Sequence, residues 1–263
     1  RESPQVFYLD TPGGWPQQIS FFPDGVVYFK ASPDGKKLLL ATQTGGDEQY
    51  NIYLLDETKA LIPLLIDRSY RVESVAWSPN SRWFAYTANA RNKIDMDLYR
   101  YDLKTSTSTL LSERNGQNTV TDISPDEQWI SITNFRSVTD SDILLFNTQT
   151  KEITNLTREN EPTYSDSGFF TSNSKNLFFL SDKEQGTRQV VLIPIAQPKK
   201  RRLLTGGPWE VEQLILSSKR REVAFLRNEE GYSKLEGFEI EPGGGTIRLL
   251  NLPPSKKSVI TSL

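Results

Sequence analysis

The residue types that the chemistry of a serine hydrolase requires are incomplete in this chain. The sequence of 263 residues contains no histidine and no cysteine. A serine hydrolase needs a base, usually histidine, that takes the proton from its nucleophile. No Gly-x-Ser-x-Gly turn is present to expose such a serine. We therefore expect no catalytic residue in this chain, and the lack of cysteine excludes disulfides and thiolate metal sites.

Two polar patterns have the spacing of known sites. Ser172 and Lys175 are spaced as in a serine–lysine pair, in which a neutral lysine acts as the base. They fall on the fourth copy of a repeated serine-led turn, so we interpret them as corner residues. Carboxylates also lie two residues apart at two places, Asp95 with Asp97 and Asp140 with Asp142. Calcium takes about six to eight oxygen ligands, so we interpret both pairs as strand entries whose carboxylates bond their own loops. We predict no metal site and no cofactor.

Exposed aromatic and basic residues are the remaining candidates for binding. Trp15 and Trp209 both follow a glycine pair, near the connection from one repeat unit to the next. We predict that they line the mouth of the fold and contact substrate. The basic run 199–202 falls on a polar turn between two strands. With 31 basic and 33 acidic residues and a formal charge of -2, the chain has no overall attraction to nucleic acid or to an anionic membrane.

The elements that position these residues come from a five-fold repeat. A serine-led turn recurs at Ser32, Ser78, Ser124, Ser172 and Ser217, with separations of 46, 46, 48 and 45 residues. In the first three copies a proline follows, which presets φ for a turn, and then an Asp or Asn that can bond the local backbone. A fixed period of about 40–50 residues indicates one supersecondary unit repeated along the chain.

Each repeat unit contains four short strand patterns. In the second complete unit they cover residues 72–77, 83–87, 98–102 and 109–111, which alternate in polarity and are rich in β-branched and aromatic residues. Trp77, Trp83 and Trp129 recur at repeat positions and predict packing between units. Four antiparallel strands per unit predict an all-β fold, a β-propeller with one unit per blade. A stacked solenoid is the alternative, but its units usually carry helices or are shorter.

Both ends of the chain fall inside a unit. Residues 6–10 align with a third strand and 16–19 with a fourth, whereas 258–263 match a first strand. We therefore predict a single β-propeller domain over residues 1–263, with five complete blades plus partial blades at both ends. Such a domain is incomplete, and its unpaired strand edges lead us to expect low solubility or dimerisation of the isolated chain.

The loops between these strands carry a family resemblance. The stretch 45–56, Gly-Gly-Asp-Glu-Gln-Tyr-Asn-Ile-Tyr-Leu-Leu-Asp, resembles the first full blade of prolyl oligopeptidase-family serine peptidases, above all the acylaminoacyl-peptidase and dipeptidyl-aminopeptidase-like branch. The likeness continues through residues 77–80, 88–92, 97–99, 140–142, 228–233 and 252–254. It thus covers nearly the whole chain, although the turns at 172–175 and 217–220 lack the Pro-Asp-Gly pattern. Single blade motifs are shared with TolB-like propellers.

The resemblance implies the N-terminal, TolB-like β-propeller of a serine peptidase. In that family the propeller accompanies a C-terminal α/β-hydrolase domain, filters peptide substrates by size and lines the cavity above the catalytic serine. It therefore implies that hydrolase domain, which is absent from this chain, and peptide substrates as partners. Glu229 and Glu230 are similar to the paired glutamates with which dipeptidyl-peptidase propellers hold a substrate's amino terminus. We include both as candidate substrate-binding residues.

Two other function classes remain open. A stand-alone TolB-like or WD-repeat-like propeller that acts as a protein-interaction scaffold is the alternative reading. A sugar-processing propeller enzyme is less well supported, because no carboxylate cluster stands out across the blades. No apolar run is long enough to span a membrane, and no leader of the signal-peptide type opens the chain. Since the lack of cysteine also fits a reducing compartment, we expect a cytoplasmic location and no membrane partner.

Overall fold

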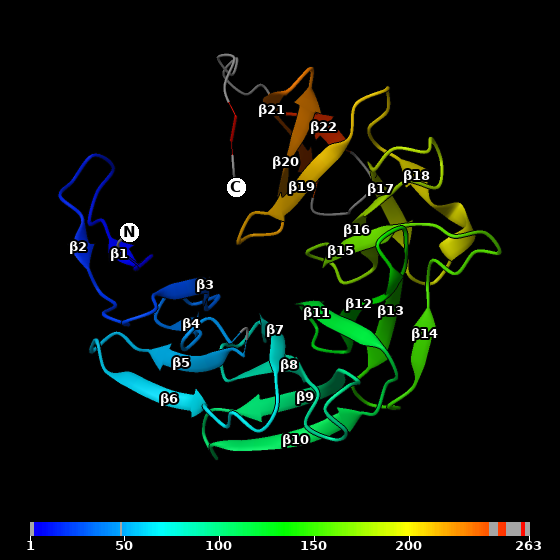
Figure 1. Cartoon of the computed structure of the whole chain (residues 1–263). Helices are drawn as coiled ribbons and strands as arrows, with labels where there is room; N and C mark the ends of the chain where they lie inside the picture. The colour runs from blue at the N-terminus through cyan, green and yellow to red at the C-terminus, as the bar shows by residue number, and fades with distance from the viewer. Residues whose placement is uncertain (1–2, 48, 242–246, 251–258, 261–263) are drawn as a thin grey trace. The chain divides into compact units, whose positions relative to one another are not determined.

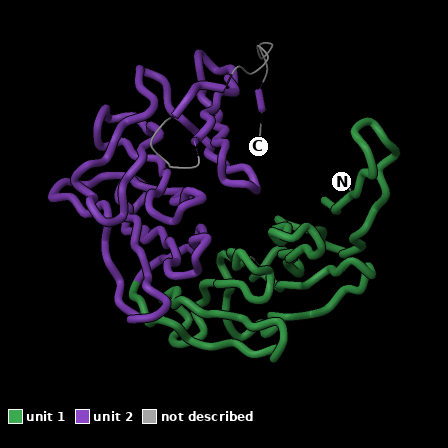
Figure 2. Tube along the Cα trace, turned by 180° about the vertical axis from the view of Figure 1, so that it is seen from behind, with its two compact units in different colours: residues 1–115 green, residues 116–263 purple. Residues whose placement is uncertain are grey.

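The chain folds almost entirely into antiparallel β-sheets (Figure 1). The computed structural model describes residues 3–47, 49–241, 247–250 and 259–260. It contains two compact units, residues 1–115 and 116–263 (Figure 2). Within the described ranges the only helical segment is the short 3-10 turn η1 (Pro198–Lys200), so no helix there has the length or hydrophobicity to cross a bilayer.

The first unit contains one two-stranded sheet and two four-stranded sheets. The strands are β1 (Phe7–Tyr8) and β2 (Gln17–Gln18); β3 (Val26–Ala31), β4 (Leu38–Thr42), β5 (Asn51–Leu55) and β6 (Leu61–Leu65); and β7 (Val72–Trp77), β8 (Trp83–Ala88), β9 (Asp97–Asp102) and β10 (Thr107–Ser112). Strands that follow one another in the chain are neighbours in each sheet. The pair β1–β2 confirms the predicted half blade at the N-terminal side, since a third-strand and a fourth-strand pattern pair with each other.

The second unit contains three four-stranded sheets. The strands are β11 (Gln117–Ile123), β12 (Trp129–Ser137), β13 (Asp140–Asn147) and β14 (Ile153–Asn155); β15 (Ser165–Phe170), β16 (Asn176–Ser181), β17 (Gln189–Pro194) and β18 (Arg202–Leu203); and β19 (Val211–Leu216), β20 (Glu222–Glu229), β21 (Tyr232–Ile240) and β22 (Ile247–Leu249). Five complete four-stranded repeats are thereby confirmed. The predicted strand 258–263 lies outside the described residues, apart from Val259 and Ile260.

The repeated turns share one hydrogen-bonding scheme. In each, the side-chain oxygen of the leading residue accepts the backbone N–H five positions later, as in Ser32 with Lys37 at 2.9 Å and Ser124 with Trp129 at 2.9 Å. The Asp or Asn at the third position accepts a backbone N–H in its own turn, as Asp34 does from Lys36 at 3.1 Å. This confirms the sequence interpretation of the turns as hairpin corners. The fourth residue has a positive φ, the left-handed conformation that a glycine adopts most easily. These residues are Gly35, Ser81, Glu127, Ser174 and Arg220, with φ of 71°, 57°, 58°, 59° and 55°.

The fourth corner begins one residue earlier than the sequence alignment suggested. Thr171, not Ser172, accepts the N–H of Asn176 at 3.3 Å and donates to Asn173 at 2.7 Å. The alignment was wrong because it followed the residue type serine, whereas a threonine hydroxyl makes the same bonds. Ser172 is exposed and Lys175 uses its backbone N–H to complete the turn at 3.0 Å from Asn173. Both residues therefore belong to the corner, as interpreted from the sequence.

Neighbouring corners bond each other within each unit. The Ser81 hydroxyl accepts the Asp34 N–H at 3.2 Å in the first unit, and the Ser174 hydroxyl accepts the Asp126 N–H at 3.1 Å in the second. Apolar side chains fill the space between adjacent sheets of a unit. Trp77 and Trp83 are 7% and 3% exposed, and the Trp77 indole donates to the Lys30 carbonyl of the neighbouring sheet at 2.9 Å. The predicted core role of these tryptophans is confirmed.

Candidate functional site

The residues predicted to bind substrate lie in two different units. Trp15 is 88% exposed and lies in the turn that joins β1 to β2. Its predicted place, at a connection between repeat units, is therefore wrong: the strands on either side of it pair with each other. Trp209, Glu229 and Glu230 all lie in the second unit. Trp209 lies in the loop before β19, Glu229 is the last residue of β20, and Glu230 lies in the turn between β20 and β21.

Trp209 lies in the connection from β18 to β19, as predicted, and its backbone is firmly held. The buried Gln189 donates from its amide to the Trp209 carbonyl at 3.0 Å and to the Gly207 carbonyl at 3.4 Å. Arg227 donates to the Gly206 carbonyl at 2.8 Å. The Trp209 side chain is 38% exposed. A fixed backbone and a partly exposed indole make a rigid apolar contact surface, which costs little entropy when a ligand packs on it.

The hairpin between β20 and β21 lies next to this connection. The Asn228 N–H donates to the Glu210 carbonyl at 3.1 Å, which joins the hairpin to the residue that follows Trp209. Glu229 is paired with Lys234 at 3.2 Å. Glu230, at the exposed tip with φ 52°, makes no hydrogen bond or ion pair with any other described residue. The two glutamates are thus not equivalent, and only Glu230 presents an uncommitted carboxylate.

Two ion pairs that the sequence analysis did not single out support these two segments. Arg188 contacts Glu210 at 3.1 Å, and its guanidinium lies 5.7 Å from the centre of the Tyr164 ring. The hydrogen bond from Arg188 holds the pKa of Glu210 below its usual value. Arg227 is nearly buried and contacts Glu236 at 3.0 Å. These partners are far apart in sequence, so no local motif could have revealed them.

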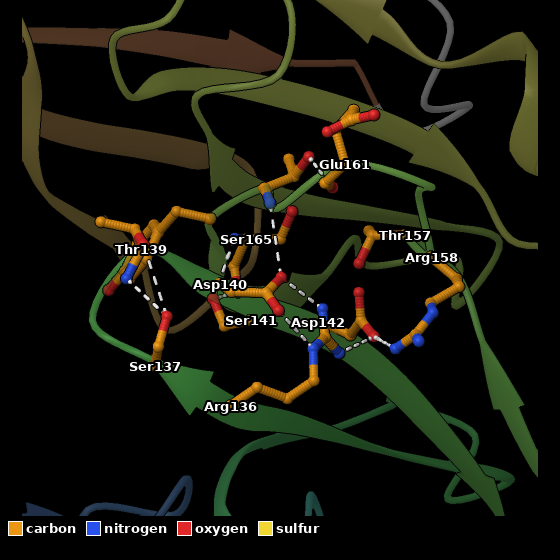
Figure 3. A network of polar contacts seen from close by, with 12 residues as sticks. Arg136, Ser137, Thr139, Asp140, Ser141, Asp142, Thr157, Arg158, Glu161 and Ser165 are labelled. Atoms are coloured by element: carbon orange, nitrogen blue, oxygen red, sulfur yellow. Dashed lines mark hydrogen bonds and ion pairs between the residues drawn. The ribbon is translucent and has the colours of Figure 1, made fainter.

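The carboxylates of the predicted pair Asp140 and Asp142 are bound by arginines (Figure 3). Arg136 binds Asp140 at 2.6 Å through its Nε and also contacts Asp142. Asp142, whose side chain is 3% exposed, also accepts from Asn155 at 2.7 Å and from Arg158 at 3.3 Å. Burial by itself would raise the pKa of Asp142, but the hydrogen bonds from these donors outweigh it and lower that pKa.

The equivalent pair in the first unit is neutralised in the same way. Asp97, which is fully buried, accepts from Arg91 at 2.8 Å and from the Arg114 N–H at 2.8 Å. Asp95 accepts from the Asn92 amide at 2.7 Å. Across the described part of the chain, no group of three or more acidic, histidine or cysteine side chains is arranged to hold a metal ion. The carboxylates bond their own loops, as interpreted from the sequence, and the arginines are the partners that the sequence analysis missed.

Comparison with known proteins identifies the family that has this architecture. Residues 25–253 match the family described as the N-terminal β-propeller domain of prolyl oligopeptidase. The chain belongs to that family. The predicted all-β propeller of four-stranded blades and the resemblance to prolyl oligopeptidase-type peptidases are therefore confirmed. A search of the curated proteins found no sequence match.

Solved structures agree with the fold of this prolyl oligopeptidase-type propeller. TolB from Acinetobacter baumannii superposes with a TM-score of 0.69 at 18% identity, over 97% of this chain and 60% of that one. A structure from a study of two prolyl endopeptidases gives 0.71 at 15% identity, over 95% of this chain and 39% of that one. An oligogalacturonate lyase from Vibrio parahaemolyticus gives 0.68 at 10% identity, over 94% and 70%. At such identities the likeness shows the fold alone, and the chain spans only 60% and 39% of the first two proteins.

The acidic groups of this propeller are of two kinds, those that the fold pairs with arginine and those that it leaves exposed. The sequence has no histidine or cysteine, and the conspicuous carboxylates Asp97, Asp140 and Asp142 are paired with arginines. What the edge of β19–β22 offers is an aromatic surface at Trp209 and a free carboxylate at Glu230.

Proposed function

We propose that this chain is the substrate-gating propeller of a prolyl oligopeptidase-like serine peptidase and has no catalytic activity of its own. The observation that carries the proposal is the family match over residues 25–253 in a sequence without histidine. A triad of the serine-peptidase type needs a base that this chain does not supply. Its partner is then a C-terminal α/β-hydrolase domain of the parent protein, and its ligands are the peptides that pass to that domain.

The loops at the edge of β19–β22 support a role in substrate selection. Trp209 provides an apolar surface on a backbone held by Gln189 and Arg227. Glu230 provides a negative charge for a peptide's amino terminus or a basic side chain. We include Glu229 with less weight on its charge, because Lys234 already neutralises it. Trp15 belongs to the other unit and would contact substrate separately.

Hydrolysis by the isolated chain and by the parent protein tests the proposal. The purified chain should release no chromophore from acyl-peptide or dipeptide substrates, whereas the parent protein should do so. The parent should also cleave a given bond faster in a short peptide than in an unfolded protein. Replacing Trp209 with alanine should change KM for long peptides and leave KM for short substrates unaffected. The control is Glu239→Gln, which changes an exposed side chain of β21.

Two results would contradict the proposal. If hydrolytic activity copurified with the isolated chain through successive columns, the chain would contain a catalytic group that we have not recognised. A parent protein without a hydrolase domain, which captures a protein partner instead, would favour the stand-alone scaffold. We propose a cytoplasmic location on the lack of cysteine alone, and fractionation of cells that express the parent protein tests it.

A further inference from the structure

A cavity of about 440 Å³ lies between the two four-stranded sheets of the first unit. Three segments line it: the loop before β5, the connection from β6 to β7, and the loop between β8 and β9. The lining residues are Asp47, Gln49, Ser69, Tyr70, Arg71, Asn89, Lys93 and Ile94. Its volume falls within the range of small-molecule sites, about 300–1,000 Å³. It lies in a different unit from Trp209 and Glu230.

Most polar groups of this cavity are already committed to the fold. The Asn89 side chain accepts the Arg71 N–H at 2.7 Å and donates to the Lys93 carbonyl at 2.8 Å. Arg71 contacts Glu73 at 3.2 Å, and Asp47 is paired with Arg68. These groups shape the walls, and their charges are balanced locally.

Lys93 is the exception among the charged residues. Its backbone has φ 68° and its N–H donates to the Asn89 carbonyl at 2.8 Å, which fixes where the side chain begins. The ammonium lies 5.9 Å from the centre of the Tyr70 ring. No carboxylate among the described residues forms an ion pair with it. Hydrogen bonds from Ser69 are the main cause of the lowered pKa of Asp67, and the charge of Lys93 lowers that pKa slightly further. The cavity therefore contains a cation that no carboxylate pairs directly.

Gln49 contributes a second uncommitted group. Its side-chain oxygen is buried and has no hydrogen-bond partner among the residues that the structure describes. A buried acceptor without a donor costs about 1–3 kcal/mol, so the site favours a molecule that brings an N–H or O–H. The rim is apolar on one side, where Ile94 is 76% exposed. An anionic group, a hydrogen-bond donor close to it and an apolar side chain are the three features that such a cavity complements.

We propose that this cavity binds the carboxyl-terminal residue of a short peptide. The carboxylate contacts the Lys93 ammonium, the terminal amide N–H donates to the Gln49 oxygen, and an apolar side chain packs on Ile94 and the Tyr70 ring. Every peptide with a free carboxyl terminus carries a carboxylate and an amide N–H on the same α-carbon. The class of ligand is therefore a peptide of the kind that hydrolysis releases, with an apolar last residue. This site is separate from the proposed gating role, because binding here requires no hydrolase domain.

Calorimetric titration of the chain with acetyl-alanyl-leucine, as the free acid and as the C-terminal amide, tests the site. The acid should bind at least about tenfold more tightly than the amide, since a charge-assisted hydrogen bond contributes about 1.5–3 kcal/mol. Lys93→Gln should abolish this preference. Gln49→Leu should weaken binding of the acid several-fold, with no loss of folded protein.

The matched control is Lys151→Gln in the second unit. Lys151 has φ 66° and its ammonium lies 5.8 Å from the centre of the Phe146 ring, so it has the backbone conformation and ring contact of Lys93, but its ammonium donates to the Thr148 carbonyl at 2.6 Å and does not line the cavity. This variant should bind as the wild-type chain does. Equal binding of acid and amide, unchanged binding by Lys93→Gln, or no binding by the folded chain would each overturn the proposal. Equally tight binding of inorganic phosphate would replace it with a general anion site, and because no hydrolysis is measured, none of these results bears on the gating function.

Discussion

Removing Asp122 from β11 should destabilise the second unit more than any comparable surface change. Asp122 accepts the Phe170 N–H of β15 at 2.9 Å. It also accepts two hydrogen bonds from the guanidinium of Arg220, at 2.5 and 2.8 Å. Arg220 comes from the corner between β19 and β20 and donates further to the Phe170 carbonyl at 3.0 Å and the Ile123 carbonyl at 3.3 Å. One ion pair thus ties three successive sheets together near their first strands.

The size of the effect follows from burial and from the bonds that are lost. The side chains of Asp122 and Arg220 are 11% and 21% exposed, so solvent screens the pair only in part. Loss of one partner of a fully buried pair costs about 3–5 kcal/mol. Allowing for the remaining exposure, we expect Asp122→Ala to lower the free energy of unfolding by about 3 kcal/mol, with the Phe170 N–H also left without its acceptor. Arg220→Ala should cost about 2 kcal/mol, because it leaves Asp122 its bond from Phe170.

A double-mutant cycle measured by urea unfolding tests this reasoning. If the two side chains act through one contact, the double variant should be less destabilised than the sum of the single variants, by about 1.5–2 kcal/mol. Arg221→Ala is the control, since Arg221 is the exposed neighbour of Arg220 and its side chain has no partner among the described residues. A coupling energy below about 0.5 kcal/mol, or an Asp122→Ala variant no less stable than Arg221→Ala, would refute the stabilising role of the ion pair between Asp122 and Arg220.

Three further changes test other parts of the fold. Asp142→Asn should lower the free energy of unfolding at pH 7 by about 1–2 kcal/mol. Because the pKa of Asp142 is lowered on folding, this difference should disappear as the pH falls through that lowered pKa, which urea unfolding over a descending pH series would show. Gly168→Ala places a Cβ 2.4 Å from the Ser131 hydroxyl and should cost about 1–3 kcal/mol; Ser131→Ala in the same chain should recover most of it, and a failure to recover would place the strain elsewhere. Gly35→Ala, with φ 71° and no atom within 4 Å of the new Cβ, should cost about 1 kcal/mol by thermal unfolding, and Gly35→Asn should cost less.

The blades were predictable because the signals that define them are local. Each corner depends on a hydroxyl and a left-handed residue within a few positions, with an Asp or Asn between them in the first four corners, and strand patterns alternate over short windows. The one misplaced corner shows the limit of residue identity, since Thr171 makes the bonds that a serine makes elsewhere. The position of Trp15 was mistaken for a related reason. A glycine pair before a tryptophan marks a turn but does not say which strands the turn joins.

The binding features were less predictable because they depend on contacts between distant segments. Trp209 and Glu230 were predicted from their residue types. The hydrogen bond from the Asn228 N–H to the Glu210 carbonyl, which brings their loops together, connects residues that β19 and most of β20 separate in the sequence. The arginine partners of the paired carboxylates lie in loops or, in the case of Arg136, near the end of β12, where the sequence alone is typical of ordinary solvated charge. The uncommitted state of Lys93 and of Gln49 is a property of what surrounds them, which no motif encodes.

The distribution of charge in the structure limits what the propeller can do. Carboxylates at repeat positions such as Asp97 and Asp142 form part of the architecture, because nearby arginines of the same sheet bind them. A group that is already satisfied by the fold gains little by binding a ligand, since it must first give up its partner. Recognition therefore falls to groups that the fold leaves uncommitted. Lys93 and the Gln49 oxygen are such groups in the first unit, and Glu230 beside Trp209 is such a group in the second. Under the two proposals above, the first site binds the carboxylate of a peptide and the second, independently, binds a positively charged group of a peptide. Separate loss of the two binding activities in Lys93→Gln and Glu230→Gln variants is what this assignment requires.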